Sequence, residues 1–334
     1  MKQIIWNITK VGVILFVLSA NPNKTYSQAC CSGGVPIGGN FGLGTADRNS
    51  FQILFTYDYN AINTLVNISS VLNDDVRKRT THSSILELNY GISERLSFTA
   101  LFPYIRQERK IQGYGGATDF TSTQGFGDIM FLIKYRILNP LNQPDWSWVI
   151  GSGMKLPSGK TDFKNNLGLT LVADMQPGSG SVDGLFWMFA QKSNFLTSNL
   201  SLLSISTVKL SGSNNKYNQT ESYQFGNEFQ MNLGLNYRFF KKWPLDVFAF
   251  FRYRTQSVDL INGFTFPGSG GDWLYAIPGI SIDFSSALSV RLSGDIPLYR
   301  KLKGTQLTTS YKLTAAIYYR IPSKPKVIIQ NLKL

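Results

Sequence analysis

The chain contains few residue types that could carry out chemistry, and their spacing does not assemble a catalytic group. His82 is the only histidine among the 334 residues, so a histidine-based metal site is excluded and a serine–histidine dyad would have to use it. The segment Pro157–Thr161 resembles the end of a phosphate-binding loop, but Met154 stands where that motif needs glycine. We interpret His82 as a rim or surface residue, and we predict no enzyme activity, no cofactor and no bound metal.

The two cysteines are adjacent and follow a segment typical of a secreted precursor. A basic start, one continuous apolar run over residues 11–18 and the small residues Ser27–Ala29 form the pattern of a signal peptide cleaved near Ala29. That run is too short to cross a bilayer as a helix. Cys30 would then open the mature chain, either carrying a lipid or forming a vicinal disulfide with Cys31. The chain has no other cysteine, which excludes a disulfide framework and a thiolate metal site.

Charge is the feature with the most chemical information. The net charge is +13, although charged residues make up only 16% of the chain. A strongly basic chain often binds nucleic acid, but the predicted secretion of this protein argues against a nucleic-acid partner. Assigning alternate positions of the predicted strands to the inside of a barrel gives a set of lumen-lining charged residues. They are Arg95, Lys134, Arg136, Lys155, Arg238, Arg252, Arg254, Arg291, Lys312, Arg320, Glu87, Asp128 and Glu228. Such a lumen either attracts anions, or holds a salt-bridge network that rigidifies the barrel, while cations near the periplasmic mouth could also face anionic headgroups.

The composition indicates which elements must position these side chains. Apolar residues make up 43% of the chain, yet the mean hydropathy is only -0.08, because Ser, Thr, Asn, Gln and 30 glycines replace the missing charges. A polytopic helical membrane protein is excluded, since it needs several apolar runs of about 20 residues. An aromatic content of 13% is too high for a disordered chain. The mixture is typical of a transmembrane β-barrel, which presents apolar residues to lipid and polar residues to its lumen.

Alternation of apolar and polar residues runs through the chain from about residue 50, which predicts β-strands. In residues 222–239 nearly every second residue from Tyr223 to Phe239 is apolar, and the residues between them are polar or glycine. This length exceeds a typical globular strand and fits a tilted barrel strand. The twelve predicted strands are 50–58, 81–92, 95–105, 126–137, 146–156, 184–191, 195–210, 221–239, 245–258, 272–284, 287–299 and 306–321.

The connections between these strands alternate in length. Short turns are predicted at 93–94, 139–145, 192–194, 241–244 and 285–286, and longer loops at 59–80, 106–124, 157–183, 211–220, 260–271 and 300–305. Short periplasmic turns and long extracellular loops are typical of outer-membrane barrels, and an even strand number places both termini in the periplasm. Seven aromatic residues near the turns are predicted to form a periplasmic girdle: Trp146, Trp148, Trp243, Tyr135, Tyr237, Phe239 and Tyr319.

Several short motifs occur in a fixed order between residues 80 and 321. They are Asn89–Leu96, Gly125–Asp128, Ile133–Arg136, Met154–Gly159, Pro177–Ser181, Tyr223–Gly226, Pro278–Ile280, Ile296–Tyr299 and Gly304–Leu307. In these motifs the chain resembles the phenol-degradation meta-pathway family of outer-membrane β-barrel transporters. The resemblance implies an outer-membrane transporter, without fixing its solute or its functional residues. The chain departs from the usual barrel end, because a basic tail follows the last predicted strand.

Taken together, the sequence predicts an all-β fold, a transmembrane antiparallel up-and-down β-barrel of about twelve strands with both termini periplasmic. Its parts are a signal peptide (1–29), a periplasmic N-terminal segment (30–49), the barrel (50–321) and a periplasmic C-terminal tail (322–334). We expect a monomer in the outer membrane of a Gram-negative bacterium, inserted by the barrel-assembly machinery and surrounded by lipid and lipopolysaccharide, with no nucleic-acid partner.

The predicted function is that of a porin-like passive transporter or narrow channel for a small solute, either aromatic and hydrophobic or anionic. In a barrel of eight strands the side chains fill the lumen, and a barrel of sixteen strands encloses an open channel. A barrel of twelve strands is intermediate, so we expect a narrow pore. The alternative is a non-conducting structural or binding barrel whose extracellular loops contact a partner.

Overall fold

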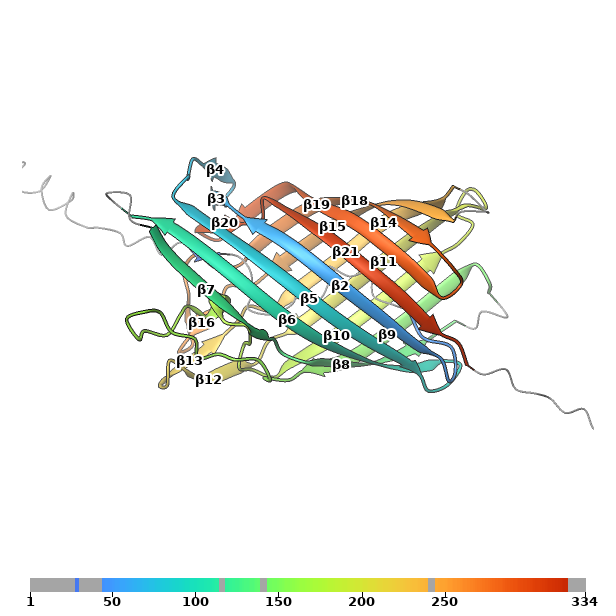
Figure 1. The fold of residues 1–334 in the computed structure, drawn as a ribbon, viewed down its shortest axis with the longest axis horizontal. Coiled ribbons are helices and arrows are strands. Elements are labelled where there is room, and N and C mark those ends of the chain that lie inside the picture. Colours follow the sequence, from blue (N-terminus) through green and yellow to red (C-terminus); the bar gives the residue numbers. More distant parts are fainter. Residues whose placement is uncertain (1–27, 30–43, 114–117, 139–142, 240–243, 324–334) are drawn as a thin grey trace, which may run out of the picture.

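The computed structural model describes residues 28–29, 44–113, 118–138, 143–239 and 244–323 (Figure 1). Most of the predicted signal peptide, both cysteines, Trp243 and the tail from residue 324 lie outside the described residues. The main element is one antiparallel sheet that closes on itself through the pairing of β5 with β6. Its strands are β2 (Phe51–Ile62), β5 (Arg77–Gly91), β6 (Leu96–Gln112), β7 (Thr118–Phe126), β8 (Met130–Arg136), β9 (Trp146–Lys155), β10 (Asp183–Lys192), β11 (Leu200–Leu210), β14 (Glu228–Arg238), β15 (Leu245–Gln256), β18 (Gly271–Asp283), β19 (Leu288–Leu302) and β21 (Tyr311–Ile321).

The wall has twelve strand positions, because β7 and β8 pair with different parts of β6 and share one position. Each wall strand pairs with the next one along the chain, and β21 returns to pair with β2. In lipid every backbone polar group needs a partner inside the protein, and closure provides one. The predicted all-β class and the twelve-stranded antiparallel up-and-down barrel are therefore confirmed.

The two ends of the barrel differ in their connections. At one end, which we name the turn end, short segments join β5 to β6, β8 to β9, β10 to β11, β14 to β15 and β18 to β19. The opposite loop end carries two small sheets and the 3₁₀ turn η2 (Ala173–Met175) (Figure 1). One sheet contains β1 (Gln28–Ala29), β20 (Thr305–Thr308), β3 (Thr64–Asn67) and β4 (Ser70–Leu72), and the other β12 (Ser213–Tyr217), β13 (Glu221–Gln224), β16 (Leu260–Ile261) and β17 (Phe264–Thr265). The alternation of short and long connections is found except between β6 and β7, which are joined by residues 113–117 alone. The periplasmic position of the turn end stays a prediction.

Several predicted loops and strands were wrong in extent, and the predicted loop 59–80 contains β3, β4 and the ends of β2 and β5. The expected loop 106–124 is mostly strand, because β6 reaches Gln112 and β7 starts at Thr118. Residues 106–124 are mostly polar, and a strand that extends beyond the membrane can be as polar as a loop. Hydropathy alone therefore does not distinguish the two. The predicted strand 126–137 accordingly starts at residue 118 and is interrupted after Phe126.

The long alternating stretch 221–239 forms two strands in different sheets. β13 pairs with β12 and β16 at the loop end, and β14 belongs to the wall. Between them Gly226 passes so close to the neighbouring chain that an added Cβ would lie 1.9 Å from the Ser257 carbonyl oxygen. The last predicted strand, 306–321, is similarly divided into β20 and β21.

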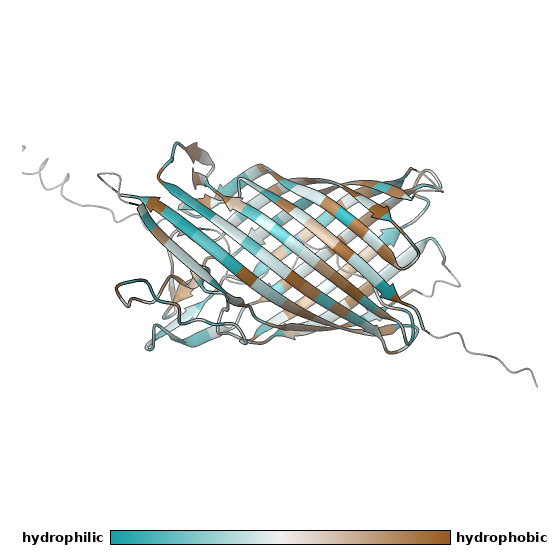
Figure 2. Ribbon diagram, in the orientation of Figure 1, coloured by the Kyte–Doolittle hydropathy of each residue, from teal (hydrophilic) through white to brown (hydrophobic). Residues whose placement is uncertain are grey.

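Burial alternates along the wall strands as the sequence pattern predicts. In β15 the side chains of Phe248 and Phe250 are 3% and 4% exposed, whereas Phe251 is 57% exposed on the outside. Figure 2 shows hydrophobic residues recurring along the wall with paler or hydrophilic ones between them. Exposed aromatic residues at the turn end include six of the seven predicted girdle residues: Tyr135, Trp146, Trp148, Tyr237, Phe239 and Tyr319. Within the described residues, no helix is long and apolar enough to cross a membrane.

The interior of the barrel is packed and only partly polar. One buried apolar cluster consists of Ile85, Leu101, Ile105, Met130, Leu132, Val149, Leu185, Trp187, Phe189 and Ile205. A second consists of Val66, Phe248, Phe250, Trp273, Tyr275, Ile277 and Leu302. Leu203 packs against both clusters and joins them. The predicted aromatic girdle concerns the outer surface, and the inward aromatic residues of these clusters lie outside that prediction.

Candidate functional site

The candidate site is the barrel interior, where charged side chains from distant strands form ion pairs. Asp295 of β19 accepts from Arg252 of β15 at 2.5 Å and lies 3.2 Å from the ammonium of Lys312 on β21. Lys312 also lies 3.9 Å from Asp58 of β2. All four side chains are at most 5% exposed, so they stabilise one another without help from bulk water.

Two further interior cations combine an ion pair with an aromatic face. Lys134 lies 3.4 Å from Glu87, and Arg254 donates to Glu228 at 2.8 Å. The cation of each also lies 4.6 Å from the centroid of an indole ring, Trp187 for Lys134 and Trp273 for Arg254. Because cations are attracted to aromatic faces, these contacts hold both charges against the apolar clusters.

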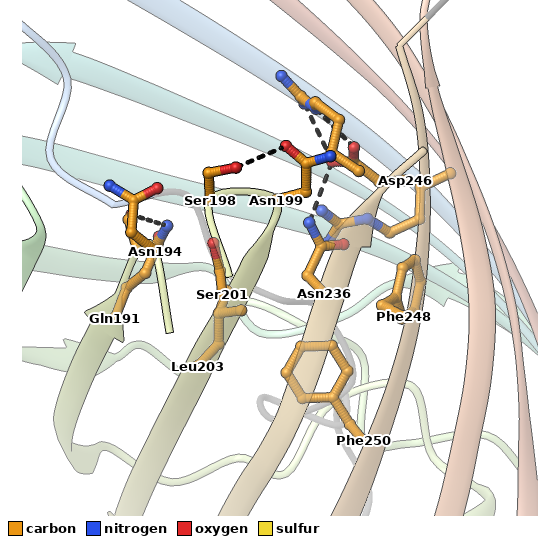
Figure 3. Close-up of a pocket in the computed structure, with 13 residues that line it drawn as sticks. Gln191, Asn194, Ser198, Asn199, Ser201, Leu203, Asn236, Asp246, Phe248 and Phe250 are labelled. Carbon is orange, nitrogen blue, oxygen red and sulfur yellow. Dashed lines mark hydrogen bonds and ion pairs between the residues drawn. The ribbon is translucent and has the colours of Figure 1, made fainter. Parts of the chain in front are cut away.

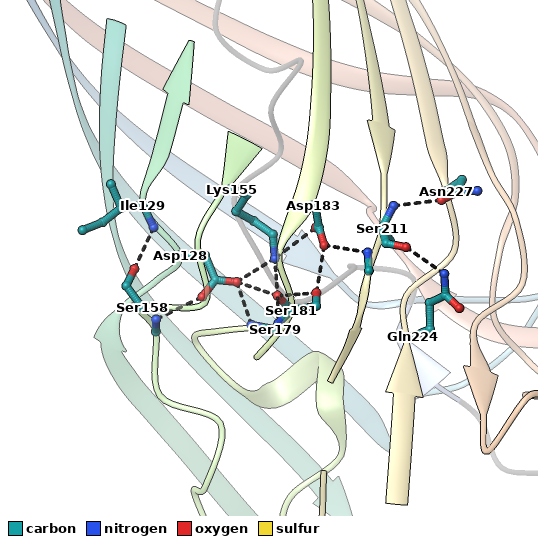
Figure 4. Close-up of polar contacts among 12 residues, drawn as sticks. Asp128, Ile129, Lys155, Ser158, Ser179, Ser181, Asp183, Ser211, Gln224 and Asn227 are labelled. Carbon is teal, nitrogen blue, oxygen red and sulfur yellow. Dashed lines mark hydrogen bonds and ion pairs between the residues drawn. The ribbon is translucent and has the colours of Figure 1, made fainter. Parts of the chain in front are cut away.

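A third group of charges, the Lys155 cluster, lies where the wall strand β7/β8 is interrupted (Figure 4). The Lys155 ammonium is 2.7 Å from Asp128 and 3.0 Å from Asp183, and all three side chains are buried. Ser179 donates its backbone N–H to Asp128 at 2.9 Å and its hydroxyl to the same carboxylate at 2.6 Å. Ser181 donates to Asp183 at 2.8 Å. The cluster therefore joins the break between β7 and β8 to β9, to β10 and to the connection before β10.

The loop end contains two more buried carboxylates that sequence analysis missed. Arg79 of β5 donates to Asp174 at 2.6 Å and also contacts Gln107. The hydroxyl of Tyr223 donates to Asp259 at 2.6 Å. Burial raises the pKa of the Asp259 carboxyl above its ordinary value, and burial together with the Asp259 charge raises the pKa of Tyr223. Both carboxylates come from connections, where strand alternation gives no signal.

At the turn end, the segment before β2 enters the barrel mouth. Thr45 and Ala46 are buried, and Arg136 donates to the Thr45 hydroxyl at 2.7 Å. Asn89 donates to the Gly44 carbonyl at 3.0 Å, and Arg320 pairs with Asp47. Residues 44–47, predicted as part of a periplasmic segment, therefore occupy part of the mouth.

An open cavity of about 400 Å³, which we name the turn-end cavity, lies at the same end of the barrel (Figure 3). Its lining includes Leu203, Phe248, Phe250 and Arg291. The Arg291 guanidinium lies 5.2 Å from the centroid of Phe248. The remaining lining residues are polar and include Gln191, Asn194, Ser198, Asn199, Ser201, Asn236, Arg238 and Asp246.

The structure places twelve of the thirteen predicted charged residues in the interior or its mouths, and one outside. Arg95 lies exposed in the turn between β5 and β6, where it donates to the hydroxyl of Tyr135 at 3.5 Å on the outer surface. Arg238 lies at the turn-end mouth, where it pairs with Asp246 at 2.7 Å and with Asp283 at 2.9 Å. The predicted excess of interior cations becomes smaller, because several carboxylates absent from the prediction also lie inside: Asp58, Asp174, Asp183 and Asp259.

His82 lies on the outer face of β5, among tyrosines. Its Nδ1 is 2.7 Å from the hydroxyl of Tyr57, and its ring centroid is 5.3 Å from that of Tyr59 in an edge-on arrangement. The neighbouring Ser83 is buried on the opposite face of the strand. Among the described residues, no group of three or more potential metal ligands comes together.

A closed wall with an apolar exterior, aromatic residues at the turn end and an ion-paired interior defines an outer-membrane β-barrel. A crystal structure of an outer membrane channel from Pseudomonas putida aligns with a TM-score of 0.65 at 12% identity, covering 84% of this chain and 99% of that one. The β domain of the Bordetella autotransporter BrkA aligns with a TM-score of 0.42 at 8% identity, over 82% and 100% of the two chains. A Pseudomonas aeruginosa FadL homologue aligns with a TM-score of 0.41 at 10% identity, covering 81% of this chain and 90% of that one.

The sequence comparison defines the family. The family model described as "Putative MetA-pathway of phenol degradation" matches residues 75–313, and the chain belongs to this family. A comparison with curated proteins gave no match. The resemblance stated from the sequence motifs is therefore confirmed.

Proposed function

We propose that the protein is a passive transporter that carries a small, uncharged and largely apolar solute through the barrel interior. The observation that carries this proposal is the continuity of apolar side chains along the interior. Leu203 contacts both buried clusters and also lines the turn-end cavity. An apolar molecule would thus meet apolar side chains along much of its way and reach a cavity of about 400 Å³.

The charges of the interior favour an uncharged solute over an anion. Arg252, Arg254 and Lys134 each lie beside a carboxylate, so their positive charge is largely neutralised. A ring of cations can select anions only if its positive charges are not already neutralised by neighbouring carboxylates. The salt-bridge interpretation of the lumen charges is therefore the one we adopt.

Orientation and surroundings form part of the proposal. An even number of strands puts both ends of the wall on the turn side, and we propose that this side faces the periplasm of a Gram-negative cell after secretion. The exposed aromatic residues at the turn end support contact with the lipid interface there.

A bulky residue at the junction of the two clusters tests the transport function. Leu203→Trp should reduce protein-dependent uptake of the apolar fluorophore N-phenylnaphthylamine by intact cells, because the indole would fill the junction. The matched control is Leu202→Trp, one residue away on the same strand and on the opposite face, which should leave uptake unchanged. Equal uptake by both variants and the wild type would contradict a path past Leu203.

The second candidate is a non-conducting structural barrel. The density of buried ion pairs favours it, because such networks rigidify a wall. It predicts that cells with and without the protein take up the fluorophore at the same rate, and that planar bilayers containing the protein show no channel events.

A further inference from the structure

The outer face of the wall changes from apolar to basic along β5 and β6. On β6 the outward residues from Leu96 to Tyr104 are apolar or aromatic, and the next outward residue is Arg106. A strand of about 9–11 residues crosses the hydrocarbon core when it is tilted, so the stretch from Leu96 to Tyr104 is long enough to do so. Arg106 therefore lies just beyond the apolar band, and the loop-end parts of β5 and β6 are largely hydrophilic (Figure 2).

Two cross-strand pairs of basic residues lie on this hydrophilic part of the outer face. Lys78 of β5 lies directly opposite Lys110 of β6, and His82 lies directly opposite Arg106. Partners in a ladder point to the same face of the sheet, and here that face is the outer one, because Arg79, next to Lys78, points inward and is 2% exposed. Like charges directly opposite one another destabilise a sheet. We name Lys78, His82, Arg106 and Lys110 the outer basic patch.

The charge of the outer basic patch is only partly compensated by the protein. Glu108 stands between the two pairs and accepts from Arg106 at 2.6 Å. Among the residues that the structure describes, neither Lys78 nor Lys110 forms an ion pair with a carboxylate. The Lys110 ammonium instead lies 5.8 Å from the centroid of Phe120 on β7. The outer basic patch therefore carries a net positive charge that faces the surroundings of the barrel.

Another part of the wall at the same end shows the opposite arrangement. Asp272 of β18 lies directly opposite Lys301 of β19, and the hydroxyl of Tyr253 donates to Asp272 at 3.1 Å on the outer face. Opposite charges in register across a ladder stabilise a sheet. The like charges on β5 and β6 lack such compensation, so an anion from outside the protein would relieve their repulsion.

Aromatic residues mark the height of the outer basic patch relative to the membrane. Tyr57 and Tyr104 are each 39% exposed, and Tyr104 packs edge-on against Phe126 with ring centroids 5.4 Å apart. The hydroxyl of Tyr57 lies 2.7 Å from the Nδ1 atom of His82. Exposed tyrosines are typical of the membrane–water interface. The outer basic patch begins at this level and extends away from the apolar band, so it lies beside the headgroups of the surrounding lipid.

We propose that the outer basic patch binds the phosphate groups of lipid A, the lipid anchor of lipopolysaccharide, in the outer leaflet. Lipid A carries a phosphate at each end of its disaccharide, and phosphates form strong charge-assisted hydrogen bonds with lysine and arginine. The patch faces sideways from the wall, so its ligand approaches in the plane of the membrane, as a lipid does. This inference rests on the proposed orientation, in which the loop end faces outward, and is independent of the proposed solute.

The test compares two double variants that each remove two exposed cations from the loop end. The purified, folded protein in detergent is titrated with diphosphoryl lipid A, and binding is measured by native mass spectrometry. Lys78→Gln with Lys110→Gln should weaken binding about tenfold or more, because two charge-assisted contacts are lost. The matched control is Lys301→Gln with Lys303→Gln, which should bind within about twofold of the wild type, because both lysines are exposed but lie outside the patch.

Unfolding in denaturant provides a second measurement and shows that the variants fold. Without lipid A, the patch variant should unfold at the same or a higher denaturant concentration than the wild type, because the repulsion between Lys78 and Lys110 is removed. Diphosphoryl lipid A should raise the unfolding midpoint of the wild type and of the control, since a ligand that binds only the folded state stabilises it. The midpoint of the patch variant should stay unchanged.

Several results would overturn the assignment. Equal affinity of the wild type and the patch variant would show that the phosphates bind elsewhere, and an equal loss in the control would show general attraction to loop-end cations. Phosphatidylglycerol bound as tightly as lipid A would show that any anionic lipid suffices. A wild-type dimer that the patch variant separates would make the patch a protein interface.

The orientation is tested separately. Phe264 is 78% exposed at the loop end, so Phe264→Cys, in a background of Cys30→Ser and Cys31→Ser, should react with a membrane-impermeant maleimide on intact cells. Reaction only after permeabilisation would refute the proposed orientation and the assignment to lipid A with it. The solute path would still be judged by Leu203→Trp, whose result leaves the outer basic patch unaffected.

Discussion

The ion pair between Arg252 and Asp295 allows a quantitative test of how the interior is stabilised. Both side chains are 5% exposed, their atoms are 2.5 Å apart, and Asp295 also lies 3.2 Å from Lys312. Asp295→Ala would leave two buried cations without their shared carboxylate. Breaking a buried pair costs about 3–5 kcal/mol. In this variant Lys312 would still lie 3.9 Å from the carboxylate of Asp58 and so would not be wholly unpaired. We therefore expect the loss of unfolding free energy to fall near the lower end of that range.

The assay is denaturant unfolding of the barrel in lipid vesicles, followed by tryptophan fluorescence and by the mobility shift of folded barrels on gels. Two controls separate charge from general damage. Asp272→Ala removes a carboxylate that accepts from Tyr253 at 3.1 Å on the exposed side, and should cost about 1 kcal/mol or less. The double variant Arg252→Met with Asp295→Leu removes the pair together and should recover much of the loss, because replacing a buried pair by apolar residues is often neutral.

Two outcomes would refute this reasoning. A loss for Asp295→Ala no larger than that for Asp272→Ala would show that the pair is not desolvated in the membrane-embedded barrel. A double variant as unstable as the single variant would show that packing volume, and not the unpaired charge, decides the cost.

Four other predictions concern the interior ion pairs and the two ends of the barrel. Since the interior cations are paired, the anion/cation permeability ratio from reversal potentials should lie within about twofold of unity, and a strongly anion-selective pore would contradict the pairing. Replacing Arg252 and Arg254 by Glu should lower the yield of folded barrel on gels, because each new carboxylate would face a buried acid. Burial raises the pKa of Asp259 above 3.8, so the folded protein holds the carboxyl proton more tightly than the unfolded chain does. Stability should therefore rise as pH falls through the folded pKa toward 3.8, and the difference between the denaturation midpoints at pH 3.8 and at about pH 7 should be smaller in Asp259→Asn. In Gly91→Val a Cβ would lie 1.9 Å from the Asp47 carbonyl oxygen, so residues 44–47 should leave the mouth, become cleavable by added protease and increase the conductance.

Much of the barrel follows from local sequence pattern. Strand alternation depends only on the two-residue period of an extended chain, so β9, β10 and β15 were predicted to within two residues at each end. Exposed aromatic residues such as Trp146 and Tyr319 mark the turn end for the same local reason. Alternation failed where a strand leaves the wall, as at Gly226, because the pattern continues across the break.

The pairing of charges required the tertiary structure. Lys312 and Asp58 lie near opposite ends of the sequence and meet only because β21 returns to β2 and closes the barrel. Asp174 and Asp259 lie in connections, where no periodicity assigns a face. The sequence therefore predicted an excess of lumen cations and left open whether they are paired, and the fold places many of them beside carboxylates.

The sequence by itself determined that this chain is a twelve-stranded outer-membrane barrel. In each strand, alternate residues face lipid and the lumen, so apolar and polar residues alternate along the sequence. Only the tertiary structure decided what the interior holds. Register between distant strands sets which acid meets which cation, as at Asp295. Closure of the sheet also brings Lys155, at the end of β9, to Asp128 and Asp183. Both depend on contacts between segments far apart in the chain, and no local pattern encodes them.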